Sequence, residues 1–308
     1  MKNNLPLVSV LVPSFNREKY ISETIESILA STYKNFEIII VDDCSNDNTV
    51  KIANNYAKLD SRVIIHINDV NLGQFRNRNK AISLARGKYV KFLDSDDLIY
   101  PNSLEIMVRC LDQFPDAAFA IQYELGLTSK PFPFLIPPRE AYFKHFLGGG
   151  LLFPGPSAVI FRKSILDTFI YEPTAGTIAD THLLLRIAAV ANIVALPNNL
   201  IFWRVHNEQV SEEQRTNYKV LWERHFMNLE VLTSENVPLS REEASIILRI
   251  HSKLICRNFL KLSIKEKSLK KLYYLKKKAK LSWYNFADAL LPNQQLIRRL
   301  NFVSEVEP

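Results

Sequence analysis

The feature of this chain that most constrains its fold is a regular alternation of short β-branched runs and helical patterns. Expected strands cover residues 8–12, 36–42, 63–67 and 89–93, and helical patterns cover 20–30, 49–58, 76–85 and 101–113. Residues 37–41 are apolar almost throughout, as expected of a strand that is covered on both faces. The alternation predicts an α/β fold with a mostly parallel central sheet flanked by helices.

The pattern changes farther along the chain. Six prolines and three consecutive glycines predict a loop over residues 128–156. A helix is expected at 180–191, short strands at 193–196 and 201–204, and only helices after residue 211. We therefore expect a domain over 1–210, with a nucleotide-binding half of about 1–115 and an acceptor half of about 116–210, followed by a helical region over 211–308.

The excess positive charge lies in the helical region. Residues 1–210 carry 21 basic and 21 acidic side chains, whereas 211–308 carry 18 and 11, which accounts for the net charge of +7. Eleven of these basic residues lie within 253–280, interleaved with apolar residues at helical spacing. Two interpretations stay equally open: a solvated helix face, or a surface for anionic lipid. No nucleic-acid recognition motif accompanies the charge, so nucleic acid is not an expected partner.

Cysteine usage and hydropathy bear on the compartment. The three cysteines, Cys44, Cys110 and Cys256, lack the spacing of a zinc site or a disulfide framework. No uncharged apolar run approaches the roughly 18 residues that a membrane span requires. We expect a cytoplasmic protein, either soluble or peripheral on the inner face of the cytoplasmic membrane.

The first strand leads into Pro13-Ser14-Phe15-Asn16-Arg17. The segment contains no glycine, so it builds neither a dinucleotide fingerprint nor a phosphate-binding P-loop. Its aromatic ring, amide and guanidinium suit stacking on a base and pairing with its polar edge. Taken alone, however, the segment favours a structural role, in which Asn16 caps the next helix and Phe15 packs beneath it.

Carboxylates follow two further expected strands. After 36–42, Asp43 is a candidate for accepting hydrogen bonds from a base or a ribose, whereas Ser45 or Asp47 is expected to cap the next helix. After 89–93 comes Asp94-Ser95-Asp96-Asp97, a DXD motif, whose charges repel one another unless a cation or hydrogen-bond donors compensate them. Such oxygen ligands suit Mg²⁺ or Mn²⁺. Asp97 fits equally well as a cap of the helix expected near Pro101.

Four motifs together resemble a known family. They are 13–17, 41–47, 71–73 with Arg78-Asn79, and 92–97, and their order and spacing are similar to those of the inverting family 2 glycosyltransferases with the GT-A fold, of the bacterial surface-polysaccharide type. The close similarity covers residues 5 to about 115. It implies a sugar nucleotide as donor, usually a UDP-hexose or a UDP-N-acetylhexosamine, and a hydroxyl of a glycan or lipid-linked glycan as acceptor.

The resemblance also implies roles for individual residues. The nucleotide would contact Pro13, Phe15, Asn16, Arg17, Asp43, Arg78, Asp94 and Ser95. Asp96 would hold the Mn²⁺ or Mg²⁺ that binds the diphosphate, and His206, in a segment that looks like the family's aromatic-Arg-x-His element, would be a second ligand. Asp180 would be the catalytic base. The family often has Glu-Asp there, whereas this chain has Ala179-Asp180.

Two other functions remain as alternatives. A non-catalytic protein that binds sugar nucleotides or glycans could keep the same fold, although Asp94, Asp96, Asp180 and His206 together disfavour it. A nucleotidyltransferase would need a loop rich in Gly, Lys and Arg near the N-terminus for a triphosphate, and residues 13–17 do not form one. The expected function is therefore an inverting, metal-dependent glycosyltransferase.

Overall fold

The structure is a computed structural model that describes residues 5–123, 130–206 and 218–300. The chain forms two compact units: one comprises residues 1–174 and 179–209, and the other comprises 175–178 and 210–308. The predicted boundary after residue 210 lies outside the described residues.

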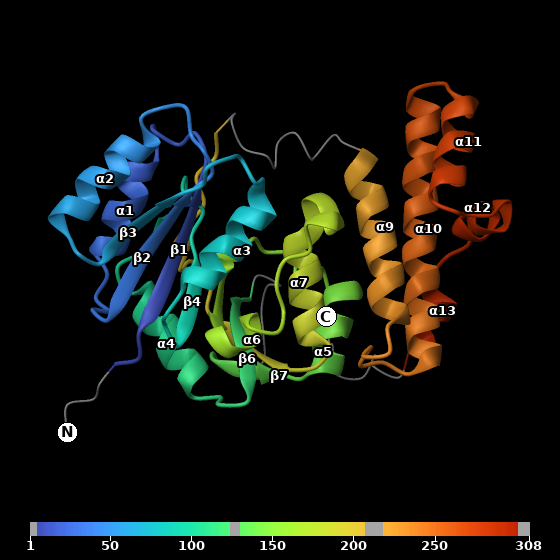
Figure 1. The fold of residues 1–308 in the computed structure, drawn as a ribbon. Helices are drawn as coiled ribbons and strands as arrows, with labels where there is room; N and C mark the ends of the chain where they lie inside the picture. The colour runs from blue at the N-terminus through green and yellow to red at the C-terminus, as the bar shows by residue number, and fades with distance from the viewer. Residues whose placement is uncertain (1–4, 124–129, 207–217, 301–308) are drawn as a thin grey trace. The chain divides into compact units, whose positions relative to one another are not determined.

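The first unit is built on one large sheet (Figure 1). Its strands are β1 (Val8–Ser14), β2 (Phe36–Asp42), β3 (Val63–Ile67), β4 (Tyr89–Phe92), β6 (Ala117–Gln122), β7 (Phe134–Ile136), β8 (Val159–Arg162) and β9 (Asn192–Leu196), in the order β3-β2-β1-β4-β8-β6-β9-β7. Its main helices are α1 (Ile21–Leu29), α2 (Thr49–Leu59), α3 (Gln74–Leu84), α4 (Ser103–Asp112), α5 (Pro138–Phe146), α6 (Lys163–Leu166) and α7 (Ala179–Ala188). The predicted α/β fold is confirmed.

The parallel part of the sheet explains where polar loops meet. β1 pairs in parallel with β2 and β4, so that Val10 lies between Ile38 and Lys91. The carboxyl ends of these three strands therefore reach the same edge, which is where open α/β sheets bind ligands. Antiparallel pairing of β8 with β4 and β6 then extends the sheet.

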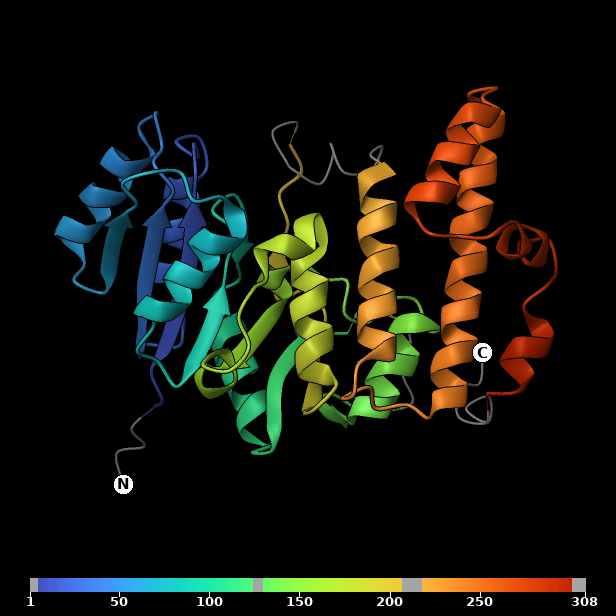
Figure 2. The same ribbon diagram turned by 45° about the vertical axis from the view of Figure 1, so that its right-hand side comes forward.

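Helices cover both faces of this sheet. Side chains of β1 and β2 such as Val10 and Ile38 share one buried core with α1 and α4. α3 packs against β1 and β2 from the opposite face, where Leu11 and Ile39 are buried (Figure 2). Both faces are apolar because both are covered, which explains the continuous apolar run of β2.

The predicted loop over 128–156 is wrong for residues 134–136 and 138–146. β7 lies within it and pairs antiparallel with β9, and α5 follows directly. Pro138 occupies the first turn of α5, where proline is accepted because its missing N–H has no helical partner. The strand β6 also joins the sheet at a place where no strand was predicted.

The second unit is helical, as predicted. Its helices are α9 (Tyr218–Thr233), α10 (Arg241–Lys265), α11 (Leu269–Lys278), α12 (Trp283–Ala289) and α13 (Gln294–Arg298). α10 begins with a capping box between Ser240 and Glu243, and its residues Ile255, Cys256 and Phe259 join α11 and α12 in a separate buried core. Within the described residues, no helix is long and apolar enough to span a bilayer.

Candidate active site

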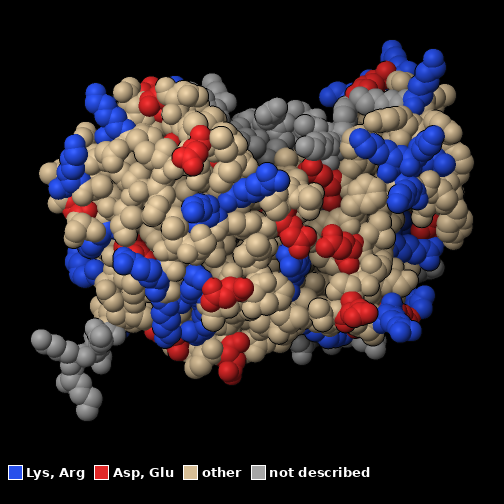
Figure 3. Space-filling model, viewed as in Figure 1, with Lys and Arg blue, Asp and Glu red and all other residues tan. Residues whose placement is uncertain are grey.

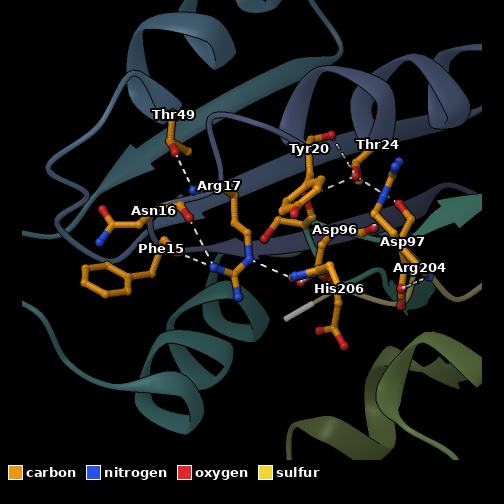
Figure 4. Close-up of polar contacts among 12 residues, drawn as sticks. Phe15, Asn16, Arg17, Tyr20, Thr24, Thr49, Asp96, Asp97, Arg204 and His206 are labelled. Atoms are coloured by element: carbon orange, nitrogen blue, oxygen red, sulfur yellow. Dashed lines mark hydrogen bonds and ion pairs between the residues drawn. The ribbon is translucent and has the colours of Figure 1, made fainter. Parts of the chain in front are cut away.

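The loops at the carboxyl edge of the sheet bring together residues that are far apart in sequence (Figure 4). A two-stranded sheet accounts for part of this: β5 (Leu98–Ile99) pairs antiparallel with β10 (Ile201–Phe202). The residues that follow β10 therefore run beside the turn that precedes β5. This pairing places His206 against Asp96, and all residues of the site belong to the first unit.

Asp96 is the centre of this cluster. Its Oδ2 accepts a hydrogen bond from Arg17 Nε at 3.2 Å and lies 3.0 Å from His206 Nε2. Tyr20 stacks on the His206 ring with 4.4 Å between centroids. All three polar side chains keep some exposure, 12% for Asp96, 20% for Arg17 and 10% for His206. Asp96 and His206 are therefore reachable from solvent, while Arg17 and Tyr20 hold them in position.

The donor set fits a divalent cation. A carboxylate oxygen and an imidazole nitrogen converge from separate segments, and both are ligands that Mn²⁺ accepts. The guanidinium of Arg17 offsets the charge of Asp96 in this arrangement. A cation bound between Asp96 and His206 would take over that role, leaving Arg17 able to bind an anionic ligand.

Asp97 is buried beneath the turn and does not cap a helix. α4 begins at Ser103 after Asn102, with no capping side chain, so the capping role considered for Asp97 is wrong. Its Oδ1 accepts a hydrogen bond from the backbone N–H of Arg204 at 3.2 Å. Burial, together with the nearby charges of Asp94 and Asp96, raises the pKa of Asp97 to about 7. Asp97 thus ties the turn to the segment that carries His206.

A second cluster joins Asp94 to Asp180 through one arginine. Arg78 on α3 donates from Nη2 to Asp94 Oδ1 at 2.8 Å and from Nη1 to Asp180 Oδ1 at 2.5 Å. Arg78, expected at the nucleotide, has a side chain that is only 2% exposed, and it lies behind two carboxylates rather than open to a phosphate. The two carboxylates raise the pKa of Arg78 in spite of its burial. Arg78 stays charged and holds both acids in place.

Aromatic rings enclose the Arg78 cluster. The guanidinium carbon lies 5.7 Å from the ring centroid of Phe75 and 5.6 Å from that of Tyr171. Tyr171 also donates a side-chain hydrogen bond to Asp180. Burial raises the pKa of Asp180 above its ordinary value, and the Arg78 guanidinium opposes this rise. The arrangement gives a carboxylate that is anchored on one side and 22% exposed overall.

The loop after β1 has a different local structure from the one that its sequence favours when read alone. Asn16 does not cap α1, and Phe15 is 41% exposed rather than packed beneath the helix. Asn16 adopts a positive φ of 51° and bridges to the loop after β2, accepting from Asn46 N–H at 2.9 Å and donating its own N–H to Ser45 Oγ at 2.8 Å. Short polar side chains tolerate this conformation. Phe15 is therefore left available at the edge, and Pro13 beside it is half-buried.

Asp43 organises the neighbouring loop. Its Oδ1 accepts hydrogen bonds from Asn68 Nδ2 and from the Leu72 N–H, and its Oδ2 accepts one from the Gly73 N–H, all at 2.8 Å. The buried carboxylate thus holds the turn that starts α3, the helix of Arg78. The N-cap of α2 is Asn48, with no capping side chain, so the cap expected from Ser45 or Asp47 is wrong. Asp47 instead accepts hydrogen bonds from the N–H and the hydroxyl of Thr49, which is a structural role in the loop before α2.

Several residues of the site carried no signal in the sequence. Tyr20 and Tyr171 are ordinary aromatic residues until the fold sets them against His206 and Asp180. Lys91 is fully buried under the Asp94 turn, where its ammonium donates to the carbonyl oxygens of Phe92 and Ser157.

Ser95, expected at the nucleotide, is 4% exposed, and its carbonyl accepts from Thr24 Oγ1.

Comparison with known proteins identifies the family. A family model described as glycosyl transferase family 2 matches residues 9–169. This stretch is more than half of the chain and carries the loops after β1, β2 and β4. The chain belongs to glycosyltransferase family 2. The resemblance drawn from the four motifs is confirmed.

Relatives of this family 2 chain include proteins of bacterial surface polysaccharides. It is 46% identical over 105 residues to a putative teichuronic acid biosynthesis glycosyltransferase, TuaG, of Bacillus subtilis, covering 34% of this chain and 42% of that one. It is 41% identical over 220 residues to an uncharacterized glycosyltransferase of Haemophilus influenzae, covering 68% of each. Three of the curated relatives are matched over only 42%, 13% and 39% of their own lengths.

Solved structures share the fold. S. aureus TarS in complex with UDP-GlcNAc superposes with a TM-score of 0.62 at 18% identity, over 95% of this chain and 91% of that one. A mannosyltransferase of Pyrobaculum calidifontis in complex with GDP-Man and Mn²⁺ gives a TM-score of 0.58 at 14% identity, over 95% of this chain and 88% of that one. At these identities the likeness concerns the fold.

Proposed function

We propose that this family 2 glycosyltransferase moves a sugar from a UDP-sugar to a hydroxyl of a glycan or lipid-linked glycan, with inversion at the anomeric carbon. The observation that carries the proposal is the link from Asp94 through Arg78 to Asp180. Asp94 lies at the carboxyl edge of the sheet, where we propose that the nucleotide binds. Asp180, held by the same arginine, keeps 22% of its side chain exposed and would be reached by the acceptor hydroxyl.

Asp180 is the proposed catalytic base. It lies in the first turn of α7, partly exposed, with its orientation set by Arg78 and Tyr171. A base must be fixed within hydrogen-bond reach of the hydroxyl that it deprotonates. Arg78 anchors Oδ1, and the part of the carboxylate that stays exposed would accept the proton of the acceptor hydroxyl.

The nucleotide would extend along the carboxyl edge. The exposed ring of Phe15 offers a stacking surface for the base, supported by Pro13, Asn16 and the loop that Asp43 holds. Asp94, which keeps 34% of its side chain exposed, offers its remaining oxygen to ribose hydroxyls, and Ser95 follows it in the turn. Arg17, whose guanidinium lies beside Asp96, would bind the diphosphate.

Asp96 and His206 are the proposed metal ligands. A divalent ion bound there, Mn²⁺ or Mg²⁺, supplies positive charge that offsets the charge developing on the departing diphosphate. Two observations support this: the convergence of a carboxylate and an imidazole at 3.0 Å, and the Mn²⁺ bound by a structural neighbour.

The reaction would proceed as a single displacement. The acceptor oxygen attacks the anomeric carbon from the face opposite the diphosphate, the bond from that carbon to the diphosphate oxygen breaks, and the acceptor's proton passes to Asp180. The raised pKa of Asp180 favours this transfer, because a more basic carboxylate holds the proton more readily. The Arg78 guanidinium opposes the rise in pKa and so favours the ionised form of Asp180, which is the form that accepts a proton.

The substrate classes rest on the relatives. TuaG is named for teichuronic acid biosynthesis, and TarS was solved with UDP-GlcNAc, which together support a UDP-hexose or UDP-N-acetylhexosamine donor and an acceptor in cell-surface polysaccharide synthesis.

A donor panel tests the proposal. Purified protein is incubated with Mn²⁺, a mixture of polysaccharide fragments and one of several UDP- or GDP-sugars, and release of free nucleoside diphosphate is measured. We expect release of UDP from at least one UDP-sugar, abolished by EDTA and restored by Mn²⁺. Binding of a UDP-sugar with no release under any acceptor would favour a non-catalytic sugar-nucleotide-binding protein, and release of pyrophosphate would indicate a nucleotidyltransferase.

A further inference from the structure

The helix α11 of the second unit has two unlike faces. Leu272, Leu275 and Ala279 are buried and belong to the core that this unit forms for itself. On the opposite side, at positions spaced by three, four and seven residues, lie Lys270, Tyr273, Tyr274 and Lys277. Tyr273 is 58% exposed and Tyr274 55% exposed, so large rings stand in solvent beside lysines.

Lysine and aromatic side chains are stacked along the edges of this face. Lys276 Nζ lies 6.0 Å from the ring centroid of Tyr273 and 5.1 Å from that of Trp283. Lys278 Nζ lies 4.3 Å from the ring centroid of Trp222 and 5.8 Å from that of Tyr274. These contacts hold the lysine stems against the rings, which keeps charge and apolar area in one layer.

Exposed aliphatic side chains continue the same surface. Ile264 is 74% exposed at the end of α10, and Leu269 is 83% exposed at the start of α11. Lysines flank both, and Glu266 is the one acidic residue between 253 and 280. Figure 3 shows blue side chains gathered around the end of α10 and around α11, at the upper right of the view.

The structure also shows that not all basic residues of 253–280 belong to the exposed charged surface. Lys253 is only 2% exposed, and its Nζ lies 3.4 Å from the Pro292 carbonyl oxygen. Arg257 donates to the carbonyl oxygens of Ala289 and Leu291. Lys253 and Arg257 therefore bind backbone carbonyl groups inside the second unit. The exposed charge begins at Lys261.

We propose that this surface binds the interface of an anionic lipid bilayer. We name it the basic-aromatic surface and define it by Lys261, Ile264, Lys265, Lys267, Leu269, Lys270, Tyr273, Tyr274, Lys276, Lys277, Lys278, Lys280 and Trp283. The rings of Trp and Tyr favour the headgroup level of a membrane, and each lysine near an anionic surface strengthens adsorption. A second copy of this surface would bring like charges together, so the observations favour lipid over self-association. The proposal rests only on the second unit and stands whether or not the transferase proposal holds.

Vesicle co-sedimentation of the full chain tests it. We expect binding to vesicles of phosphatidylcholine with phosphatidylglycerol, weak binding to phosphatidylcholine alone, and loss of binding as salt is raised. Equal binding to both kinds of vesicle, or none to the anionic ones at low salt, would overturn the proposal. Displacement of the protein from anionic vesicles by a short RNA at matched phosphate concentration would instead indicate a nucleic-acid surface.

Two variants and a control locate the binding surface. K270Q with K277Q removes two exposed charges from α11 and should lower the partition coefficient roughly 25-fold, about fivefold for each lysine. Y273S with W283S keeps the charge and should also weaken binding, because the rings would no longer enter the interface. K51Q with K58Q removes two exposed lysines of α2 and should leave binding unchanged. A similar loss in this control would show that net charge alone accounts for adsorption and would overturn the assignment.

Discussion

At the scale of single residues, the site is defined by shared partners rather than by isolated charges. Arg78 serves two carboxylates at once, and Asp96 is shared by Arg17 and His206. A carboxylate with a fixed cationic partner keeps its orientation but loses some basicity, and burial restores part of it. The sequence could predict Asp94 and Asp96, since both follow a strand, whereas Asp180 in the first turn of α7 was implied by the family resemblance. The sequence could not predict that one arginine joins Asp94 and Asp180, because Asp180 is 102 residues away from Arg78.

The role of Asp180 leads to the first prediction. D180N keeps the shape of the side chain but removes its basicity, so the turnover number should fall roughly 10²–10⁴-fold, the usual contribution of a general base. Nucleotide binding should change little, since Asp94 and Asp96 are intact. UDP release with the donor found in the panel measures turnover, and calorimetry measures binding. D116N, which alters an exposed acid after α4, is the matched control. Turnover of D180N near that of the control would remove Asp180 from the mechanism.

Lys91 leads to a prediction on pH. Burial lowers its pKa to about 7, from an ordinary value of 10.5. Between these values the unfolded chain binds a proton that the folded chain does not, so the stability of the fold should rise as pH increases from about 7 toward 10.5. K91M lacks this group and should lack this part of the rise, which amounts to at most about 1.4 kcal/mol for each pH unit.

Urea unfolding between pH 7.5 and 9 measures the effect, as the difference between wild type and variant. The window lies above the raised pKa of Asp97 and below the range of the buried tyrosines, so neighbouring groups contribute little to the difference. K58M, which removes an exposed lysine of α2, should keep the pH dependence of the wild type because that ammonium stays hydrated on folding. Parallel pH profiles for K91M and wild type would contradict the prediction.

At the scale of elements, the connection between α3 and β4 contains a glycine, Gly87, that packs tightly against the backbone before and within β1. A Cβ at Gly87 would lie 2.6 Å from Ser9 N and 2.7 Å from Leu7 O, and both are backbone atoms of the segment that forms β1. The Gly87 N–H also donates to Ser9 Oγ at 2.8 Å. This close approach holds β4 in register beside β1 and so places the Asp94 turn.

We therefore predict that G87A destabilises the fold by about 1–3 kcal/mol, because backbone must move to admit the methyl group. Chemical denaturation measures the change in the free energy of unfolding. G155A is the control, since nothing lies within 4 Å of a Cβ there. A loss of stability in G87A no larger than in G155A would show that the backbone around residue 87 admits a methyl group at little cost.

Elements also show where sequence patterns stop being informative. The long helices could be predicted because their periodicity repeats several times, and the strands β1 to β4 could be predicted because their apolar, β-branched runs alternate with those helices. β7 has three residues, too few for a period, and the prolines beside it indicated a loop although one of them starts α5. Asn16 was expected to cap α1, but it contacts the loop after β2, and no local pattern specifies a contact 30 residues away.

At the scale of the whole molecule, each unit has its own buried core. The first core gathers residues from β1 to β10, and the second gathers residues of α10, α11 and α12. All of the proposed nucleotide and metal ligands belong to the first unit, and the basic-aromatic surface belongs to the second. The charge difference between the two parts was visible in the sequence. The separate core of the second unit was not, since its apolar residues are interleaved with lysines.

This division leads to the last prediction. A ligand that binds only the folded first unit stabilises that unit by an amount set by its concentration, about 2.7 kcal/mol at 100 times the dissociation constant. Amide hydrogens that exchange through unfolding of that unit should then exchange roughly 100-fold more slowly with UDP and Mn²⁺ present. We expect this slowing in β1, β2 and β4, and little change in α10 and α11. Hydrogen exchange read by mass spectrometry resolves the segments. D96A, or EDTA with the wild type, should remove most of the protection, because Asp96 is the proposed metal ligand. Equal protection of α11 would show that nucleotide binding acts on the second unit as well, and unchanged exchange in β4 would place the nucleotide away from the Asp94 turn.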